Sequence, residues 1–131
     1  MHYLLDTNAI AGLLNDRPLN LVRRARQHSV HDIAISAIVI HELFYGAFKS
    51  GRASLNLARI DALRFEVIDF DKDDARQAGE IRAFLAGRGT PIGPYDVLIA
   101  GQTIARNAVL VTRNTRELAR VPRLRIENWE A

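Results

Sequence analysis

Short runs of apolar residues alternate along the chain with longer stretches in which apolar residues recur every three or four positions. The short runs are typical of buried strands, and the longer stretches are typical of helices that cover them. The predicted strands span residues 3–5, 32–35, 66–70, 108–112 and 124–126. The predicted helices span residues 8–14, 19–27, 37–49, 55–64, 73–86 and 94–106, with a short helical turn at 115–118.

Residues that favour helix ends support these boundaries. The segment Asn-Asp-Arg-Pro at 15–18 breaks the first helix. Ser36 and Asp71 are the expected N-caps of the helices that follow them, and Pro94 suits the first position of its helix. The helix at 37–49 is apolar around most of its circumference, which predicts that most of it is buried.

Strands separated by helical crossovers predict an α/β fold. Its central sheet is expected to be mostly parallel, with about five strands and with helices on both faces. The length of 131 residues is that of one domain, which we expect to span residues 1–131. In such folds ligands bind at the carboxyl ends of the strands, where the strand order reverses.

Composition excludes several classes of protein. The chain has no cysteine, which excludes disulfide scaffolds, zinc–cysteine sites, iron–sulfur clusters and thiol nucleophiles. The longest uncharged apolar run, at 33–40, is too short to span a bilayer, and the first residues do not resemble a signal peptide. These features predict a cytoplasmic protein without a membrane partner.

The basic side chains are dominated by arginine. The net charge is only +3, and sixteen of the eighteen basic residues are arginine, the exceptions being Lys49 and Lys72. A guanidinium binds phosphate or carboxylate through paired hydrogen bonds, so a phosphate-rich partner or an acidic peptide is one interpretation. A general bias of the genome toward arginine codons is the other.

Three carboxylates occur where a buried fold favours apolar residues. Asp6 closes the first strand, Glu42 lies inside an apolar helix, and Asp96 lies in the first turn of the helix that begins at Pro94. Taken singly, Asp6 and Asp96 are explained by helix capping and by the helix dipole, and Glu42 by a buried ion pair or an outward orientation.

Taken together, the acids point to a metal site. In a parallel sheet the ends of the first strand and of the strand at 108–112 share one edge, which the helix start at Asp96 can reach. Carboxylates about 4 Å apart repel by about 4 kcal/mol at an effective dielectric constant of 20, so they need a cation or strong donors. Oxygen ligands without Cys or His select Mg²⁺ or Mn²⁺. Phosphate loops and Gly-x-Ser-x-Gly elbows do not occur in the sequence.

Four segments carrying these residues resemble one family, the PIN-domain ribonucleases, and within it the VapC toxins of type II toxin–antitoxin pairs. The segments are Tyr-Leu-Leu-Asp-Thr-Asn at 3–8, Ile-His-Glu-Leu-Phe-Tyr-Gly at 40–46, Ile-Gly-Pro-Tyr-Asp-Val-Leu-Ile-Ala at 92–100 and Leu-Val-Thr-Arg-Asn-Thr-Arg-Glu-Leu at 110–118. The ending at 120–129 is also similar to that of the family. The resemblance therefore covers nearly the whole chain.

The resemblance assigns roles to single residues. Asp6, Glu42 and Asp96 fall on the family's metal-binding acids, and Thr112 falls on the hydroxyl of the site. Many members have a fourth acid two residues later, where this chain has Asn114, which brings an amide and no charge. Thr7 and Asn8 fall on polar residues that support the first acid.

The resemblance also implies partners. It implies an RNA substrate, with the initiator tRNA a frequent target of similar toxins, a homodimer, and a VapB-type antitoxin that often places an arginine among the acids. The RNA-binding candidates are arginines beside the site or on the early helices: Arg17, Arg23, Arg24, Arg26, Arg113 and Arg116.

The leading interpretation is therefore a Mg²⁺-dependent endoribonuclease. One alternative is a non-catalytic PIN-like module that binds RNA or protein, favoured weakly by Asn114. Another is a phosphatase of the haloacid dehalogenase type, which expects an aspartate at the position of Asn8.

Overall fold

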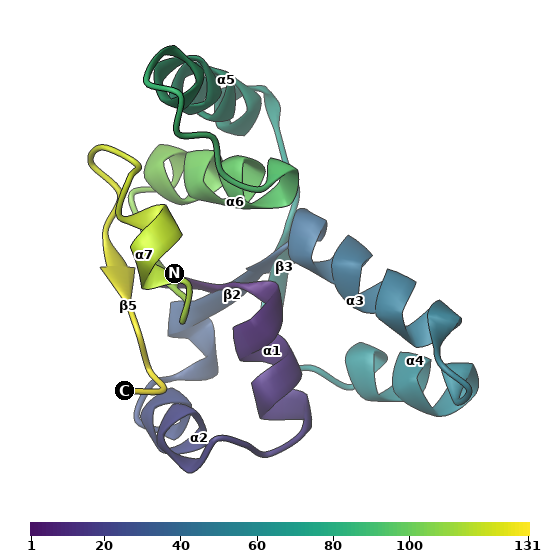
Figure 1. Ribbon diagram of the computed structural model, residues 1–131. Coiled ribbons are helices and arrows are strands. Elements are labelled where there is room, and N and C mark those ends of the chain that lie inside the picture. Colours follow the sequence, from purple (N-terminus) through teal and green to yellow (C-terminus); the bar gives the residue numbers. More distant parts are fainter.

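Five parallel strands form one sheet in the order β3-β2-β1-β4-β5 in the computed structural model of the protein, which describes residues 1–131 (Figure 1). The strands are β1 (Tyr3–Leu5), β2 (Ile33–Ser36), β3 (Glu66–Ile68), β4 (Val109–Val111) and β5 (Ile126–Glu127). The helices are α1 (Thr7–Leu14), α2 (Leu19–Arg26), α3 (Ala37–Lys49), α4 (Ala53–Asp61), α5 (Lys72–Gly87), α6 (Pro94–Ala105) and α7 (Thr115–Leu118), with a 3-10 turn at Val30–Asp32. The expected α/β fold with a parallel five-stranded sheet is confirmed.

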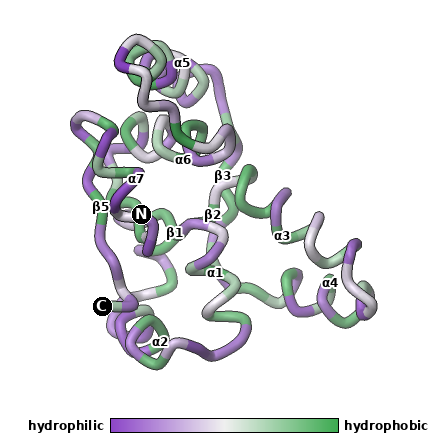
Figure 2. The backbone as a smooth tube through the Cα atoms, in the orientation of Figure 1, coloured by the Kyte–Doolittle hydropathy of each residue, from purple (hydrophilic) through white to green (hydrophobic).

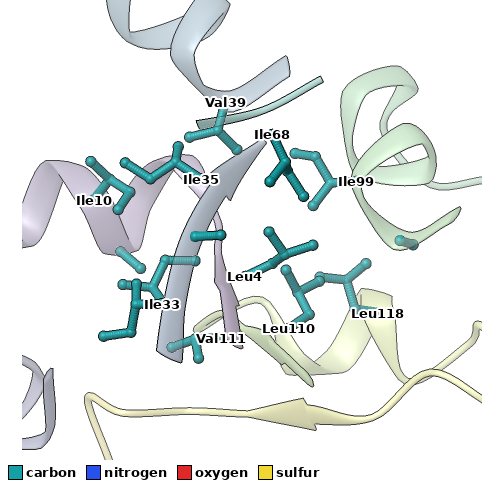
Figure 3. Close-up of a cluster of buried hydrophobic side chains, with 14 of the residues drawn as sticks. Leu4, Ile10, Ile33, Ile35, Val39, Ile68, Ile99, Leu110, Val111 and Leu118 are labelled. Atoms are coloured by element: carbon teal, nitrogen blue, oxygen red, sulfur yellow. The ribbon is translucent and has the colours of Figure 1, made fainter. Parts of the chain in front are cut away.

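Both faces of the sheet are buried. In register, Leu4 of β1 pairs with Ala34 of β2 and with Leu110 of β4, so these three side chains share one face. Figure 3 shows Leu4 and Leu110 beside Ile99 of α6 and Leu118 of α7. Helices on this face therefore exclude water from the strands.

The opposite face carries the alternate residues of the strands. Ile33 and Ile35 of β2 lie beside Ile10 of α1 in Figure 3, and all three are almost fully buried. On the outside, Figure 2 colours much of α2 hydrophilic, and only Leu21 and Val22 of this helix are buried. The apolar runs of the sequence thus become strands covered on both sides.

The expected burial of the helix at 37–49 is wrong. Only Val39, Leu43 and Ala47 of α3 are buried, whereas Tyr45 and Phe48 have 62% and 69% of their surface exposed. Figure 1 shows the reason, because α3 and α4 extend away from the sheet and α3 has no helix over its outer side.

The bounds of β2 and β4 differ from prediction by one residue, and those of β3 and β5 differ by up to two. The strand expected at 66–70 ends at Ile68, because the carbonyl of Asp69 accepts hydrogen bonds from Gln102 and Arg106 and the chain leaves the sheet. The last strand is predicted at 124–126, but β5 is Ile126–Glu127, because these two residues pair with Leu110 and Val111 of β4.

No helix combines the length and the apolar composition that crossing a membrane requires.

Candidate active site

The candidate site lies where the order of the strands reverses. From β1 the chain builds outward through β2 and β3, and it then returns to place β4 on the other side of β1. Asp6 follows β1 directly and Thr112 follows β4 directly, and the backbone N–H of Asp6 donates to the carbonyl of Val111 over 3.1 Å. The two polar residues are thus neighbours at the edge where α/β sheets bind ligands.

The Asp6 carboxylate is held by the backbone of α1 and by Thr112. The residue is 7% exposed, and its Oδ1 accepts a hydrogen bond from the N–H of Ala9 over 2.8 Å, which caps α1. Burial raises the pKa of Asp6, and the hydrogen bonds from the Thr112 hydroxyl and from Ala9 oppose that rise only in part. An ionised Asp6 is therefore short of counter-charge.

Glu42 reaches the start of α1 from α3. The hydroxyl of Thr7 donates to its Oε1 over 2.8 Å, a contact between residues 35 apart in the chain. Glu42 therefore points inward to the first strand–helix junction, and the outward orientation considered from the sequence is wrong. Thr7 follows Asp6 in the chain, so its hydrogen bond holds the Glu42 carboxylate near the end of β1.

Asp96 completes the set from the first turn of α6. Its pKa is raised by burial and, in decreasing order, by the negative charges of Glu117, Asp6 and Glu42. Carboxylates whose charges raise the pKa of Asp96 must lie within electrostatic range of it. The structure thus brings Asp6, Glu42 and Asp96 into one acidic region.

Asn114 occupies the N-cap position of α7, but its side chain makes no capping hydrogen bond there. Its Nδ2 donates instead to Oε2 of Glu117 over 2.7 Å, and its backbone N–H donates to the Thr112 hydroxyl over 3.0 Å. Asn114 therefore orients a further carboxylate, that of Glu117, beside Asp96.

Sequence reasoning missed two acids of this region, Glu117 and Glu130. Glu117 lies three residues after Asn114 in the four-residue helix α7, which is too short for a periodic signal to indicate it from the sequence. Glu130 approaches from the C-terminal segment, where its Oε1 lies 3.9 Å from Nη1 of Arg113. The negative charge of Glu130 raises the pKa of Asp6, and the positive charge of Arg113 lowers it.

The donors of this region are oxygen atoms of carboxylates, a hydroxyl and an amide, which suit a hard divalent ion. Burial is the main cause that raises the pKa values of Asp6 and Asp96, so a bound cation would stabilise their ionised forms. In the present arrangement no three acidic or histidine side chains are close enough together to share one ion. The fit to a divalent metal therefore rests on the chemistry of these donors.

Known proteins resemble this chain over nearly its full length. It matches the PIN domain family over residues 3–124. It is 41% identical over 131 residues to the tRNA(fMet)-specific endonuclease VapC of Salmonella typhimurium, with 98% of each chain covered, and 41% identical over 136 residues to ribonuclease VapC2 of Rickettsia felis, with 99% covered. A crystal structure of DNA-bound VapBC from Salmonella typhimurium superposes with a TM-score of 0.93 at 41% identity, over 98% of both chains.

Proposed function

The chain belongs to the PIN-domain family and, within it, to the VapC ribonucleases, and on this premise we propose that it is the toxin of a type II toxin–antitoxin pair. Its activity is endonucleolytic hydrolysis of RNA. Nucleases of this family depend on divalent metal ions. The observation that carries the proposal is the acidic region at the carboxyl ends of β1 and β4, with its raised aspartate pKa values.

We propose Mg²⁺ as the ion, with Mn²⁺ as a substitute, and Asp6, Glu42 and Asp96 as its ligands. Mg²⁺ is usually held by a few carboxylates and keeps positions for water and substrate phosphate. When bound, it would polarise the phosphodiester and neutralise the negative charge that develops on it.

The other residues of the site fix these carboxylates. Thr112 and the N–H of Ala9 hold Asp6, and Thr7 holds Glu42 over 2.8 Å. Asn114 holds Glu117, whose charge acts on Asp96. Hydrolysis adds water across the P–O3′ bond, so the products carry a 5′-phosphate and a 3′-hydroxyl.

The substrate and the inhibitor follow from the relatives. The Salmonella typhimurium protein is named for tRNA(fMet), and we propose the initiator tRNA as the substrate of this chain. The similar structures from Salmonella typhimurium and Rickettsia felis are VapBC complexes, which supports a VapB-type antitoxin as partner. A single domain over residues 1–131 and a homodimer remain parts of the proposal.

Incubation with an initiator tRNA transcript, followed by mapping of the new 5′ ends, tests this function. We expect discrete cleavage with Mg²⁺, none with EDTA, and none by Glu42→Gln. Cleavage that persists in EDTA and in this variant would contradict a metal-dependent site. Binding of the tRNA without cleavage under any divalent ion would favour the non-catalytic module.

A further inference from the structure

A surface pocket of about 430 Å³ lies beside the acidic region. It is bordered by Asn8, two residues after Asp6, and by Arg113, the residue after Thr112. The other polar side chains that line it are those of Asn15, Arg17 and Glu130. This volume is within the range of ligand sites, and one of its eight lining residues is hydrophobic, so the pocket suits a polar ligand.

Arg17 is fixed at one side of the pocket by its backbone. Its N–H donates to the carbonyl of Gly12 over 3.0 Å, and the turn is pressed so closely on α1 that a Cβ at Gly12 would lie 2.8 Å from the carbonyl oxygen of Arg17. Only glycine allows this approach. The guanidinium of Arg17 makes no hydrogen bond or ion pair, so its charge is free for a ligand.

Arg113 and Glu130 form the opposite side. Arg113 follows the buried Thr112, and Glu130 follows Trp129, which is 1% exposed and donates from its indole N–H to Glu127. The two charged side chains lie 3.9 Å apart, and the Arg113 side chain remains 58% exposed. A contact this long and this exposed is weak, so Arg113 can exchange it for a stronger acceptor.

We propose that this pocket, the Arg17–Arg113 pocket, binds the RNA backbone next to the scissile bond, with the two guanidinium groups on phosphate oxygens. The proposal rests on the proposed ribonuclease function, and it gives the direction in which the RNA strand leaves the acidic region. Guanidinium groups form paired, charge-assisted hydrogen bonds with phosphate. The side-chain amides of Asn8 and Asn15 present both donors and acceptors, which suit ribose hydroxyls and base edges.

The structure also separates these arginines from the other candidates. Arg24 is engaged with the carbonyl of Asn128 over 3.2 Å and with Glu127 over 3.4 Å, so it holds the C-terminal segment. Arg116 does not line the pocket. Of the candidate arginines, only Arg17 and Arg113 line the pocket.

The test measures binding apart from cleavage. The metal-free protein is titrated in EDTA against a fluorescent initiator tRNA transcript, and anisotropy gives the Kd at a series of NaCl concentrations. Arg17→Ala and Arg113→Ala should each weaken binding about tenfold, and each should lower the slope of log Kd against log salt by about one. Arg→Lys at either position should recover part of the affinity because the charge remains.

Arg76→Ala is the matched control, because Arg76 is an exposed arginine of α5 without an ion pair and outside the pocket. It removes the same charge and should leave the Kd within twofold of wild type. Circular dichroism melting shows whether each variant is folded.

Binding by Arg17→Ala and Arg113→Ala that equals that of Arg76→Ala would overturn the proposal. Loss of affinity for a decaglutamate peptide with unchanged RNA affinity would assign the pocket to an acidic protein segment and would also overturn it. Failure of the pocket proposal can be distinguished from failure of the proposed ribonuclease function. Wild-type protein that binds RNA through these arginines but never cleaves it contradicts only the ribonuclease activity, and cleaving protein indifferent to them contradicts only the pocket.

Discussion

Asp6 combines a structural role with an electrostatic one. Its carboxylate caps α1 through the N–H of Ala9, while burial raises its pKa because it removes water from the ionised form. Asp6→Asn keeps an oxygen for the cap and removes the charge. We expect this variant to have a higher Tm than wild type at pH 7 without metal, and to lose on the order of 10²-fold or more of the cleavage rate.

The raised pKa of Asp6 also predicts how the stability of the protein changes with pH. An unfolded aspartate titrates near about 3.9, and the pKa of folded Asp6 lies higher, so the native state binds more protons between the two values. The contribution of Asp6 to stability therefore falls as the pH rises through this window. Thermal melts from acidic to neutral pH should show a flatter profile for Asp6→Asn.

Asp6→Ala is the control for the cap. It removes the charge and also the hydrogen bond from Ala9, which costs about 1 kcal/mol, so its Tm should lie below that of Asp6→Asn. Equal Tm values of the two variants would contradict the capping role. A wild-type cleavage rate in Asp6→Asn would remove Asp6 from the site.

Asn114 supports Glu117 without adding charge. Asn114→Asp replaces the N–H donor of the 2.7 Å bond to Glu117 with a second carboxylate, next to an acid that already acts on Asp96. We expect a lower Tm of the metal-free protein and tighter Mn²⁺ binding, because the added repulsion is relieved by the ion. Calorimetric titration with Mn²⁺ measures the affinity, and a weaker or unchanged Kd would place Asn114 outside the metal site.

Among the helices, the contact between α5 and α6 depends on one glycine. A Cβ at Gly101 of α6 would lie 2.5 Å from both the Cα and the backbone N of Ala78 in α5. Because the obstacle is backbone, Gly101→Ala should cost about 2–3 kcal/mol of stability, measured by urea unfolding with the fluorescence of the buried Trp129.

Gly79→Ala in α5 is the matched control for this packing. A Cβ at Gly79 meets no atom within 4 Å, and alanine favours the helix, so we expect a gain of about 0.5–1 kcal/mol. Destabilisation by both substitutions alike would contradict the close-packing argument.

Local signals located most of these elements in advance. Tyr3–Leu5 and Ala37–Lys49 begin and end as predicted, because an apolar run, the Ser36 cap and the break at Ser50 all lie within the segments themselves. The burial of α3 was not predictable in this way. Apolar Tyr45 and Phe48 are exposed because no other element covers them, and this depends on the path of the whole chain.

The candidate site shows the same division. Asp6 and Thr112 were predictable as neighbours because each ends a strand of a parallel sheet. Glu117 was not, since its place depends on the hydrogen bond from Asn114, and Glu130 was not, since its place depends on the path of the C-terminal segment. Side chains brought in by loops and short helices carry no periodic signal.

Across the whole molecule, the C-terminal segment connects distant elements. Figure 1 shows it running from β5 toward α2, with the C-terminus beside that helix. Trp129 stacks on His28 with ring centroids 4.9 Å apart, and Arg24 of α2 donates to the carbonyl of Asn128 over 3.2 Å. This anchoring places Glu130 beside Arg113, so the acidic region and the Arg17–Arg113 pocket depend on the C-terminal segment being packed against α2.

The acidic region also predicts how an antitoxin should bind. A guanidinium from the partner can satisfy several carboxylate oxygens at once, but only if the acids are ionised. Because the pKa values of Asp6 and Asp96 are raised, binding such a group releases protons at a pH near those values, and the affinity should rise as the pH rises through them.

We therefore expect the purified antitoxin to bind with a higher Kd at pH 5 than at pH 7.5 in calorimetric titrations, and to compete with Mn²⁺. A variant with Asp6→Asn and Asp96→Asn should bind more weakly at pH 7.5 and should lose most of this pH dependence. Glu80→Gln, at an exposed pair 3.6 Å from Arg123 on the surface, should behave like wild type. An affinity that is independent of pH, or unchanged in the double variant, would mean that the antitoxin inhibits without occupying the acids. The apolar surface around Leu13, Leu14 and Phe44–Phe48 would then be the place to seek its contacts.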